Sequence, residues 1–295
     1  MALIIHCETS DVLPLDEYID YIATEVDFDD VDSIAASAPK LRALANDREL
    51  VVRHLNDQIK GAARGEVFPS AQSIFLARGK RFYVRANIWP SSADIAQGRV
   101  YQDHFAYHLP HDHNYSFMTV GYHGPGYVTE VYEYDHDKVE GYIGEQVDFR
   151  YLDTTLFTAG MVMLYRASKD MHIQYPPEDL SISLNLMTSN PDVLTRDQFL
   201  FDNDKRTLAR FPSGLEGSRR VSVIEIAGHL GNADTEDMLQ TLAAVHPCRR
   251  SRLTAYESLE KLAPTRSAEI WELAVKDGER LVSNAARRRL DGLGR

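Results

Sequence analysis

The stretch HLPHDHNYSFMTVGYHGPGYVTEVYEYD, residues 108–135, decides the expected fold and site. Its β-rich runs lie on either side of Gly124-Pro125-Gly126, which predicts two strands joined by a tight turn. Side chains two residues apart on a strand point to the same face, so His111 and His113 present two imidazoles toward one point. Imidazoles arranged in this way are what a transition-metal ion requires.

The chain on either side of this stretch continues the β pattern, from about residue 72 to residue 187. Short runs rich in β-branched and aromatic residues alternate with Gly, Pro and Asp turns. These runs are FYVRANIW (82–89), RVYQDHFAYHL (99–109), GYIGEQVDFRYL (141–152), GMVMLYRAS (160–168), MHIQYP (171–176) and LSISLNLM (180–187). Repeated short strands of this kind predict an antiparallel sandwich or barrel.

Helical patterns flank the β region. Residues 14–64 place apolar side chains at three- and four-residue spacing. In the tail, an Arg is followed ten residues later by Leu three times, at 220 to 230, 252 to 262 and 280 to 290, with another helical pattern between copies. This period resembles HEAT-like repeats, although an ordinary helical bundle fits as well. We therefore divide the chain into an N-terminal helical segment (1–66), a β-barrel (67–205) and a C-terminal helical domain (206–295).

Composition narrows the class of protein. The 295 residues are 44% hydrophobic and 26% charged, as in an ordinary soluble protein. A net charge of -12 disfavours nucleic acid, whose binding depends on Lys and Arg at phosphates. No apolar run approaches the ~20 residues that span a bilayer, and the N-terminus lacks the basic start of a secretory signal. We expect a cytoplasmic protein without membrane or nucleic-acid partners; Cys7 and Cys248 predict no disulfide framework.

A third metal ligand is expected from a strand that neighbours the H-x-H strand. His172, at the start of MHIQY, is the best placed candidate. The sequence therefore predicts a metal site made of His111, His113 and His172. The alternative is a histidine-rich polar pocket without metal.

These residues resemble the two metal-binding motifs of the cupin superfamily, over roughly residues 72–187. The first motif has an opening Gly, H-x-H, a Glu three or four residues later and a closing Gly. His111, His113 and Gly124 fall in phase with it, and Gly160 and His172 align with the second motif if one residue is inserted. The chain departs from the motifs at Phe105, at Phe117 or Met118 in place of the Glu, and at Arg166, Ser168 and Pro176.

The resemblance implies a mainly β fold, a cupin double-stranded β-helix (jelly roll), here with N-terminal helices and a C-terminal α-helical, repeat-like domain. Without the motif's Glu, the site looks like that of three-histidine cupin oxygenases, which bind Fe(II); Zn, Ni and Mn are the other candidate metals. Three neutral imidazoles leave about three open positions in an octahedral shell, for a substrate and dioxygen.

We therefore expect a non-haem Fe(II)-dependent cupin oxygenase or dioxygenase that acts on a small polar or amino-acid-like substrate. Two alternatives stay open. One is a non-catalytic ligand-sensing or assembly protein with a cupin binding module, and the other is a metal-dependent isomerase or lyase. The C-terminal helices are the expected surface for a homodimer or a protein partner.

Further residues are candidates for the pocket. Glu130 is a candidate ligand or base, although alternation leaves open which face of its strand points inward. Arg85 and Asn87 share a strand face, and an inward Arg would clamp a substrate carboxylate in a bidentate manner. The remaining predicted contacts with substrate are Tyr107, Tyr122 and His104, which have structural alternatives as packing or surface residues.

Overall fold

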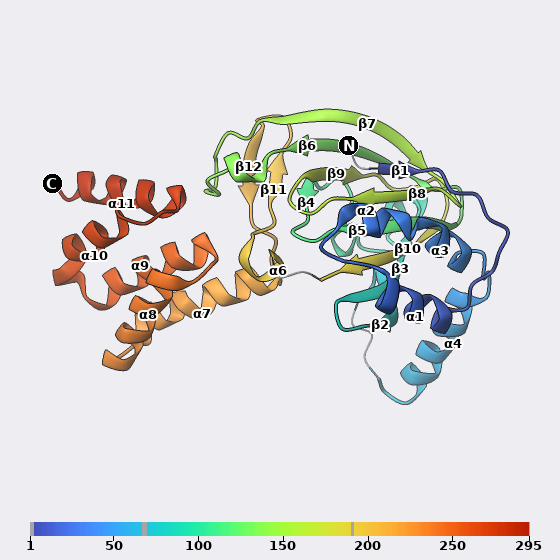
Figure 1. Cartoon of the computed structure of the whole chain (residues 1–295), viewed down its shortest axis with the longest axis horizontal. Coiled ribbons are helices and arrows are strands. Elements are labelled where there is room, and N and C mark those ends of the chain that lie inside the picture. The colour runs from blue at the N-terminus through green and yellow to red at the C-terminus, as the bar shows by residue number, and fades with distance from the viewer. Residues whose placement is uncertain (1–2, 67–69, 190–191, 295) are drawn as a thin grey trace. The chain divides into compact units, whose positions relative to one another are not determined.

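The computed structural model describes residues 3–66, 70–189 and 192–294. The chain forms two compact units (Figure 1). Unit 1 consists of Met1–Tyr134 and Phe149–Asn190, and unit 2 consists of Asp135–Asp148 and Pro191–Arg295. The predicted division into 1–66, 67–205 and 206–295 stays a prediction.

Unit 1 is built on two antiparallel sheets. The first sheet has the strand order β1 (Leu3–Ile5), β8 (Val162–Tyr165), β5 (Phe117–His123), β10 (Ser181–Thr188), β3 (Phe82–Trp89) and β2 (Ser73–Arg78). In the second sheet, unit 1 contributes β4 (His111–Asp112), β9 (Asp170–Gln174), β6 (Tyr127–Tyr134) and β7 (Phe149–Phe157), in that order. The eight strands from β3 to β10 thus follow the order 1-8-3-6 in one sheet and 2-7-4-5 in the other. This is the connectivity of a jelly roll, so the expected sandwich of antiparallel strands is confirmed.

The N-terminal helices cover the outer face of the first sheet (Figure 1). They are α1 (Leu15–Glu25), α2 (Val31–Ala36), α3 (Ala38–Leu44) and α4 (Leu50–Ala63). In α1, Tyr18 and Ile22 lie one turn apart and are fully buried, as the four-residue spacing predicts. They belong to one apolar cluster with Leu184 and Leu186 of β10. The helices therefore supply the apolar surface that this face of the sheet needs.

The inner face of the first sheet is arranged in rows of cross-strand neighbours. The Phe117 row contains Tyr83, Met187, Phe117 and Tyr165, and the Arg85 row contains Arg85, Asn185, Thr119 and Met163. Asn87, Ser183 and Gly121 form the next row. The inner face therefore carries polar and aromatic side chains, whereas the outer face of the same strands carries mainly aliphatic ones.

Unit 2 contains the hairpin of β11 (Leu200–Asp202) and β12 (Thr207–Arg210) and most of the remaining helices. These are α6 (Asp192–Thr195), α7 (Glu216–Leu230), α8 (Ala233–Val245), α9 (Arg249–Leu262), α10 (Ser267–Ala274) and α11 (Arg280–Gly292). The three copies of the Arg-to-Leu pattern begin in α7, α9 and α11, with α8 and α10 between them. A Cβ atom at Gly228 of α7 would lie 2.8 Å from Cα of Ser258 in α9, so these helices pack closely. The HEAT-like assignment itself stays a prediction.

Two expectations about the whole chain need comment. The described helices contain more residues than the described strands, so "mainly β" is correct for the barrel of unit 1 and not for the chain as a whole. α5 (Ser92–Ala96) adds a short helix within unit 1. Among the residues that the structure describes, no helix is long and apolar enough to cross a membrane.

Candidate metal centre

The three histidines named from the sequence lie together inside unit 1. His111 of β4 is the cross-strand neighbour of His172 of β9, and His113 follows β4 directly. Asp112, between the first two histidines, is fully buried, and its Oδ2 accepts a hydrogen bond of 2.5 Å from Tyr134 Oη. This bond fixes the backbone of the H-x-H segment from the side opposite the histidines.

The spacing of the three imidazoles fits a metal ion. Nε2 of His172 lies 3.1 Å from Nε2 of His111 and 3.2 Å from Nε2 of His113. Two nitrogens bound at about 2.1 Å from one ion, at angles of about 90–110°, lie roughly 3.0–3.4 Å apart. These two separations fit ligands of a common ion, and one ring nitrogen of each of the three histidines lies within 4.8 Å of the others.

The other ring nitrogens determine which tautomer each histidine adopts. Nδ1 of His111 lies 2.7 Å from the carbonyl oxygen of Leu109, so it donates there and its Nε2 keeps a lone pair. Nδ1 of His172 lies 2.7 Å from the side-chain amide of Gln174, whose buried Oε1 has no partner among the described residues. A half-turn of this amide lets Oε1 accept from Nδ1–H, which satisfies both groups and frees Nε2 of His172 for a metal.

Burial favours the neutral form of His111 and His172. Desolvation lowers the pKa of His172 well below its usual value, and repulsion from protonated His111 or His113 would lower it further. Burial also lowers the pKa of His111, partly opposed by the hydrogen bond to Leu109. Neutral imidazole is the form that binds metal, so the site favours a cation over a proton.

The cluster contains no carboxylate from the described residues. Phe117 points inward, and its ring centroid lies 5.0 Å from that of His113 and 4.6 Å from that of Tyr165. Met118 points outward into the core beneath the helices. The position of the missing ligand is therefore filled by an aromatic wall.

Glu130, the predicted ligand or base, lies on the other face of its strand. Thr129 and Val131 face the barrel interior, where Val131 is the cross-strand neighbour of His172. The carboxylate of Glu130 instead accepts hydrogen bonds from the hydroxyls of Tyr132 (2.7 Å) and Tyr175 (2.9 Å). The structure does not bring Glu130 to the histidines.

Of the other predicted residues, three lie inside the barrel. Arg85 and Asn87 face inward from β3, as their shared face predicts. Tyr107 is buried against Trp89 with 5.7 Å between ring centroids, and its hydroxyl donates to the Pro90 carbonyl oxygen at 2.8 Å. The hydroxyl of Tyr107 therefore already has a hydrogen-bond partner within the protein.

Two predicted residues lie elsewhere. Tyr122 is on the outer face of β5, where its hydroxyl donates to the carbonyl oxygen of Asp47 at 2.9 Å. His104 is exposed in a short 3₁₀ helix (Gln102–His104), beside the ring of Tyr101. The structure brings neither side chain to the histidines.

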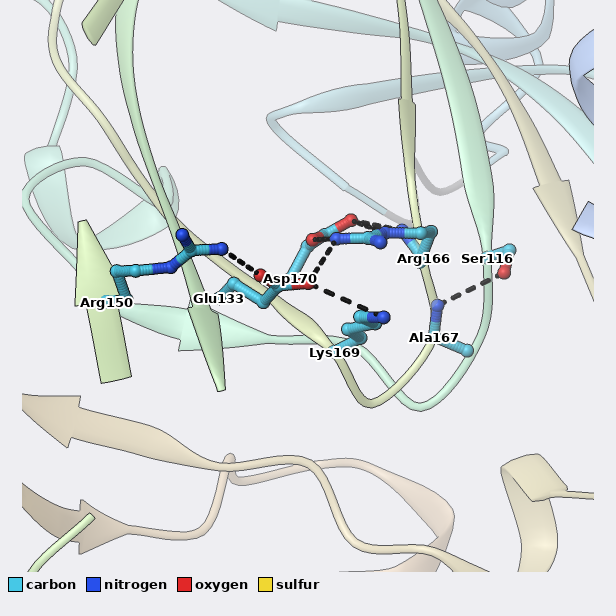
Figure 2. A network of polar contacts seen from close by, with 7 residues as sticks. All are labelled: Ser116, Glu133, Arg150, Arg166, Ala167, Lys169 and Asp170. Atoms are coloured by element: carbon cyan, nitrogen blue, oxygen red, sulfur yellow. Dashed lines mark hydrogen bonds and ion pairs between the residues drawn. The ribbon is translucent and has the colours of Figure 1, made fainter. Parts of the chain in front are cut away.

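A network of charged residues, drawn in Figure 2, was not predicted from the sequence. Arg166, at the start of the turn that connects β8 of the first sheet to β9 of the second, lies 2.5 Å from Asp170 and 3.1 Å from Glu133. Asp170 is only 2% exposed and lies two residues before His172. Hydrogen bonding to Arg150, with Arg166 nearby, lowers the pKa of Glu133 to about 2. The ion pair between Arg166 and Asp170 therefore compensates the deeply buried charge of Asp170.

The same turn is tied to the H-x-H segment. The amide of Ser168 donates to the carbonyl oxygen of His113 at 2.6 Å. The amide of Ala167 donates to Ser116 Oγ at 3.1 Å (Figure 2). We define Arg166, Ser168 and Asp170 as the turn clamp. The signal in the sequence is an Arg and an Asp four residues apart on either side of a predicted turn.

Comparison with known proteins adds weak likenesses. No protein-family model matches the chain, and no curated protein matches it. The solved structures that match include a hydroquinone 1,2-dioxygenase, PnpCD, in complex with Cd2+ and 4-hydroxybenzonitrile. Its TM-score is 0.27 at 9% identity, and the match covers 44% of this chain and 71% of that one.

Two further matches are similar in extent. A cupin domain from Bordetella pertussis Tohama I has a TM-score of 0.23 at 12% identity, over 43% of this chain and all of that one (100%). Hydroquinone 1,2-dioxygenase from Sphingomonas sp. TTNP3 with 4-hydroxybenzoate bound has a TM-score of 0.27 at 7% identity, over 42% and 69%. Likenesses this low do not establish a common fold. The jelly-roll fold is therefore assigned from the strand order, and the metal site from the geometry of the histidines.

Proposed function

We propose that this protein is a cupin-type, non-haem Fe(II)-dependent oxygenase that acts on a small polar or amino-acid-like substrate. The observation that carries the proposal is the spacing of the three Nε2 atoms, 3.1 and 3.2 Å, inside a jelly-roll barrel. When bound, ferrous iron would supply redox chemistry with dioxygen. His111, His113 and His172 would hold the ion.

The residues around the cluster support an open coordination shell. Three neutral imidazoles contribute no negative charge, and Phe117 stands where a carboxylate would have taken a further position. An octahedral ion held in this way keeps about three positions for exogenous ligands. The aromatic wall of Phe117 and Tyr165 would also limit the access of bulk water to the reacting atoms.

The proposal is tested by metal content and oxygen consumption. Protein purified without oxygen and loaded with Fe(II) is expected to bind one ion per chain, and His113→Ala is expected to bind none while keeping its fold. His123→Ala is the matched control, because His123 is exposed on β5 of the same segment. Wild-type protein that binds no metal, or His113→Ala protein that binds a full equivalent, contradicts the proposal.

A second candidate function is a ligand-sensing or assembly protein. The absent carboxylate and a separate helical unit favour it, since α7 exposes Val223, Ile226 and Leu230 along one face. A partner or a second copy bound through the C-terminal helices remains a proposal. Oxygen uptake by the Fe(II)-loaded protein with a bound substrate distinguishes the oxygenase from the sensor, and turnover without oxygen would identify an isomerase or lyase.

A further inference from the structure

The guanidinium of Arg85 lies inside the barrel without a counter-charge. No hydrogen bond or ion pair joins it to any residue that the structure describes, and its Nε atom is buried. Its neighbours on the same face of the first sheet are Tyr83, Asn87, Phe75 and Asn185, none of which is acidic. The half-buried side chain therefore has one unsatisfied buried donor, and its terminal nitrogens are open to an anion.

The two asparagines beside Arg85 have engaged acceptors and open donors. Oδ1 of Asn185 accepts from Thr119 Oγ1 at 2.7 Å, and Oδ1 of Asn87 accepts from Ser73 Oγ at 2.9 Å. No described residue accepts from either Nδ2 group. Asn87 is 5% exposed and Asn185 is 3% exposed, but neither Nδ2 atom is among the fully buried atoms without a partner, so both donors are open to a small ligand. Three adjacent side chains therefore offer N–H groups to one region.

Arg85 and Asn185 of this donor group lie in the row next to the aromatic residues that contact the histidines. The Arg85 row is adjacent to the Phe117 row, whose aromatic rings contact the histidines. Tyr115 links the two regions on the side of the β4–β5 segment: its ring centroid lies 4.9 Å from that of His113, and its hydroxyl is within electrostatic reach of Arg85. A small molecule that contacts both Arg85 and the histidines would span a mainly aromatic surface.

We propose that Arg85, Asn87 and Asn185 bind a carboxylate group of the substrate and so present the rest of the molecule to the histidine cluster. This inference rests on the proposed function, because it treats the histidines as the reacting end of the site. One guanidinium and two amides match a planar anion with a single negative charge, which Arg binds through two parallel hydrogen bonds. The aromatic rings between the two ends favour a substrate with an apolar body.

The test uses pairs of probes that differ only in charge. Acetate is compared with acetamide, and phenylacetate with phenylacetamide, by calorimetric titration into metal-free and Zn(II)-loaded protein. Metal-free wild-type protein is expected to bind at least one carboxylate about tenfold more tightly than its amide, as a charge-assisted hydrogen-bonded pair gives. Arg85→Gln should abolish this preference, and Arg85→Lys should retain part of it.

The controls separate this inference from the metal site. Arg99→Gln removes an exposed arginine that pairs with Asp94, and it should bind the probes like wild type. Metal content is measured on every variant, and Arg85→Gln should keep one ion per chain. Equal binding of each carboxylate and its amide by the wild type, or an unchanged preference in Arg85→Gln, overturns the carboxylate site. Wild-type protein that shows the preference but binds no metal ion supports the carboxylate site and overturns the proposed function instead.

Discussion

The two faces of the first sheet of unit 1 are made by the same strands and have opposite characters. On β10, Leu184 and Leu186 point outward and pack beneath the N-terminal helices. Ser183 and Asn185 alternate with them and point into the barrel, where they are equally buried. Burial alone therefore does not distinguish the two faces.

The difference lies in what each face uses its side chains for. The outer face removes aliphatic surface from water, which contributes to the stability of the folded chain. The inner face keeps hydroxyl, amide and guanidinium groups whose burial is unfavourable unless they are hydrogen-bonded. A face that bears such groups beside three clustered imidazoles is better explained by binding than by stability, and this distinction can be tested.

The largest expected effect on stability comes from breaking the buried ion pair between Arg166 and Asp170. Asp170→Asn removes the buried carboxylate that pairs with Arg166 and should lower the free energy of unfolding by about 4 kcal/mol, because the guanidinium then keeps only Glu133 as a charged partner. Because the turn clamp also holds the His113 carbonyl, we expect metal affinity to fall about tenfold. Urea denaturation and metal titration measure the two effects.

Lys169→Gln is the control for this change. Lys169 contacts Glu133 at 3.4 Å in the same network, but its side chain is 49% exposed, so both measurements should stay close to wild type. An Asp170→Asn protein that loses stability but binds metal with wild-type affinity would show that the clamp supports only the fold.

Two neighbouring substitutions on β10 compare the faces directly. Leu186→Ala should lower the free energy of unfolding by about 3 kcal/mol, because Leu186 is fully buried in the outer core, and metal binding should be unchanged. Asn185→Ala removes one hydrogen bond with Thr119 and should cost about 1 kcal/mol. If Asn185→Ala destabilises the protein as much as Leu186→Ala, the inner face is an ordinary core and the contrast between the faces fails.

The three-histidine cluster was predictable because it depends on two local rules. Side chains at i and i+2 share a strand face, which brought His111 and His113 together, and a neighbouring strand supplied His172. The apolar outer face was predictable for a similar reason, since helices with four-residue apolar spacing must cover some surface. These features depend on short-range periodicity.

The wrong predictions concern residues whose positions depend on strand pairing, which sequence periodicity does not specify. Alternation separated Glu130 from Glu133 but did not say which face of β6 is inside, and only the pairing with β9 decides it. The same ambiguity applied to Tyr122, which points to the helices. The isolation of Arg85 is likewise a property of its neighbours across strands, which no single segment encodes.

The smallest expected effect is on the pH dependence of stability, which tests whether the charge of Glu133 stabilises the protein. Hydrogen bonding to Arg150 lowers the pKa of Glu133 from 4.5 to about 2, so the folded protein binds this proton less readily than the unfolded chain does. The stabilisation is therefore present above pH 4.5 and is lost as the pH falls toward 2. After solvent screening we expect about 1 kcal/mol, seen as a gap between wild type and Glu133→Gln that closes with acidification. Glu66→Gln, at an exposed pair with Arg64, should show no such trend, and a gap that stays constant with pH would mean that the charge of Glu133 does not contribute to stability.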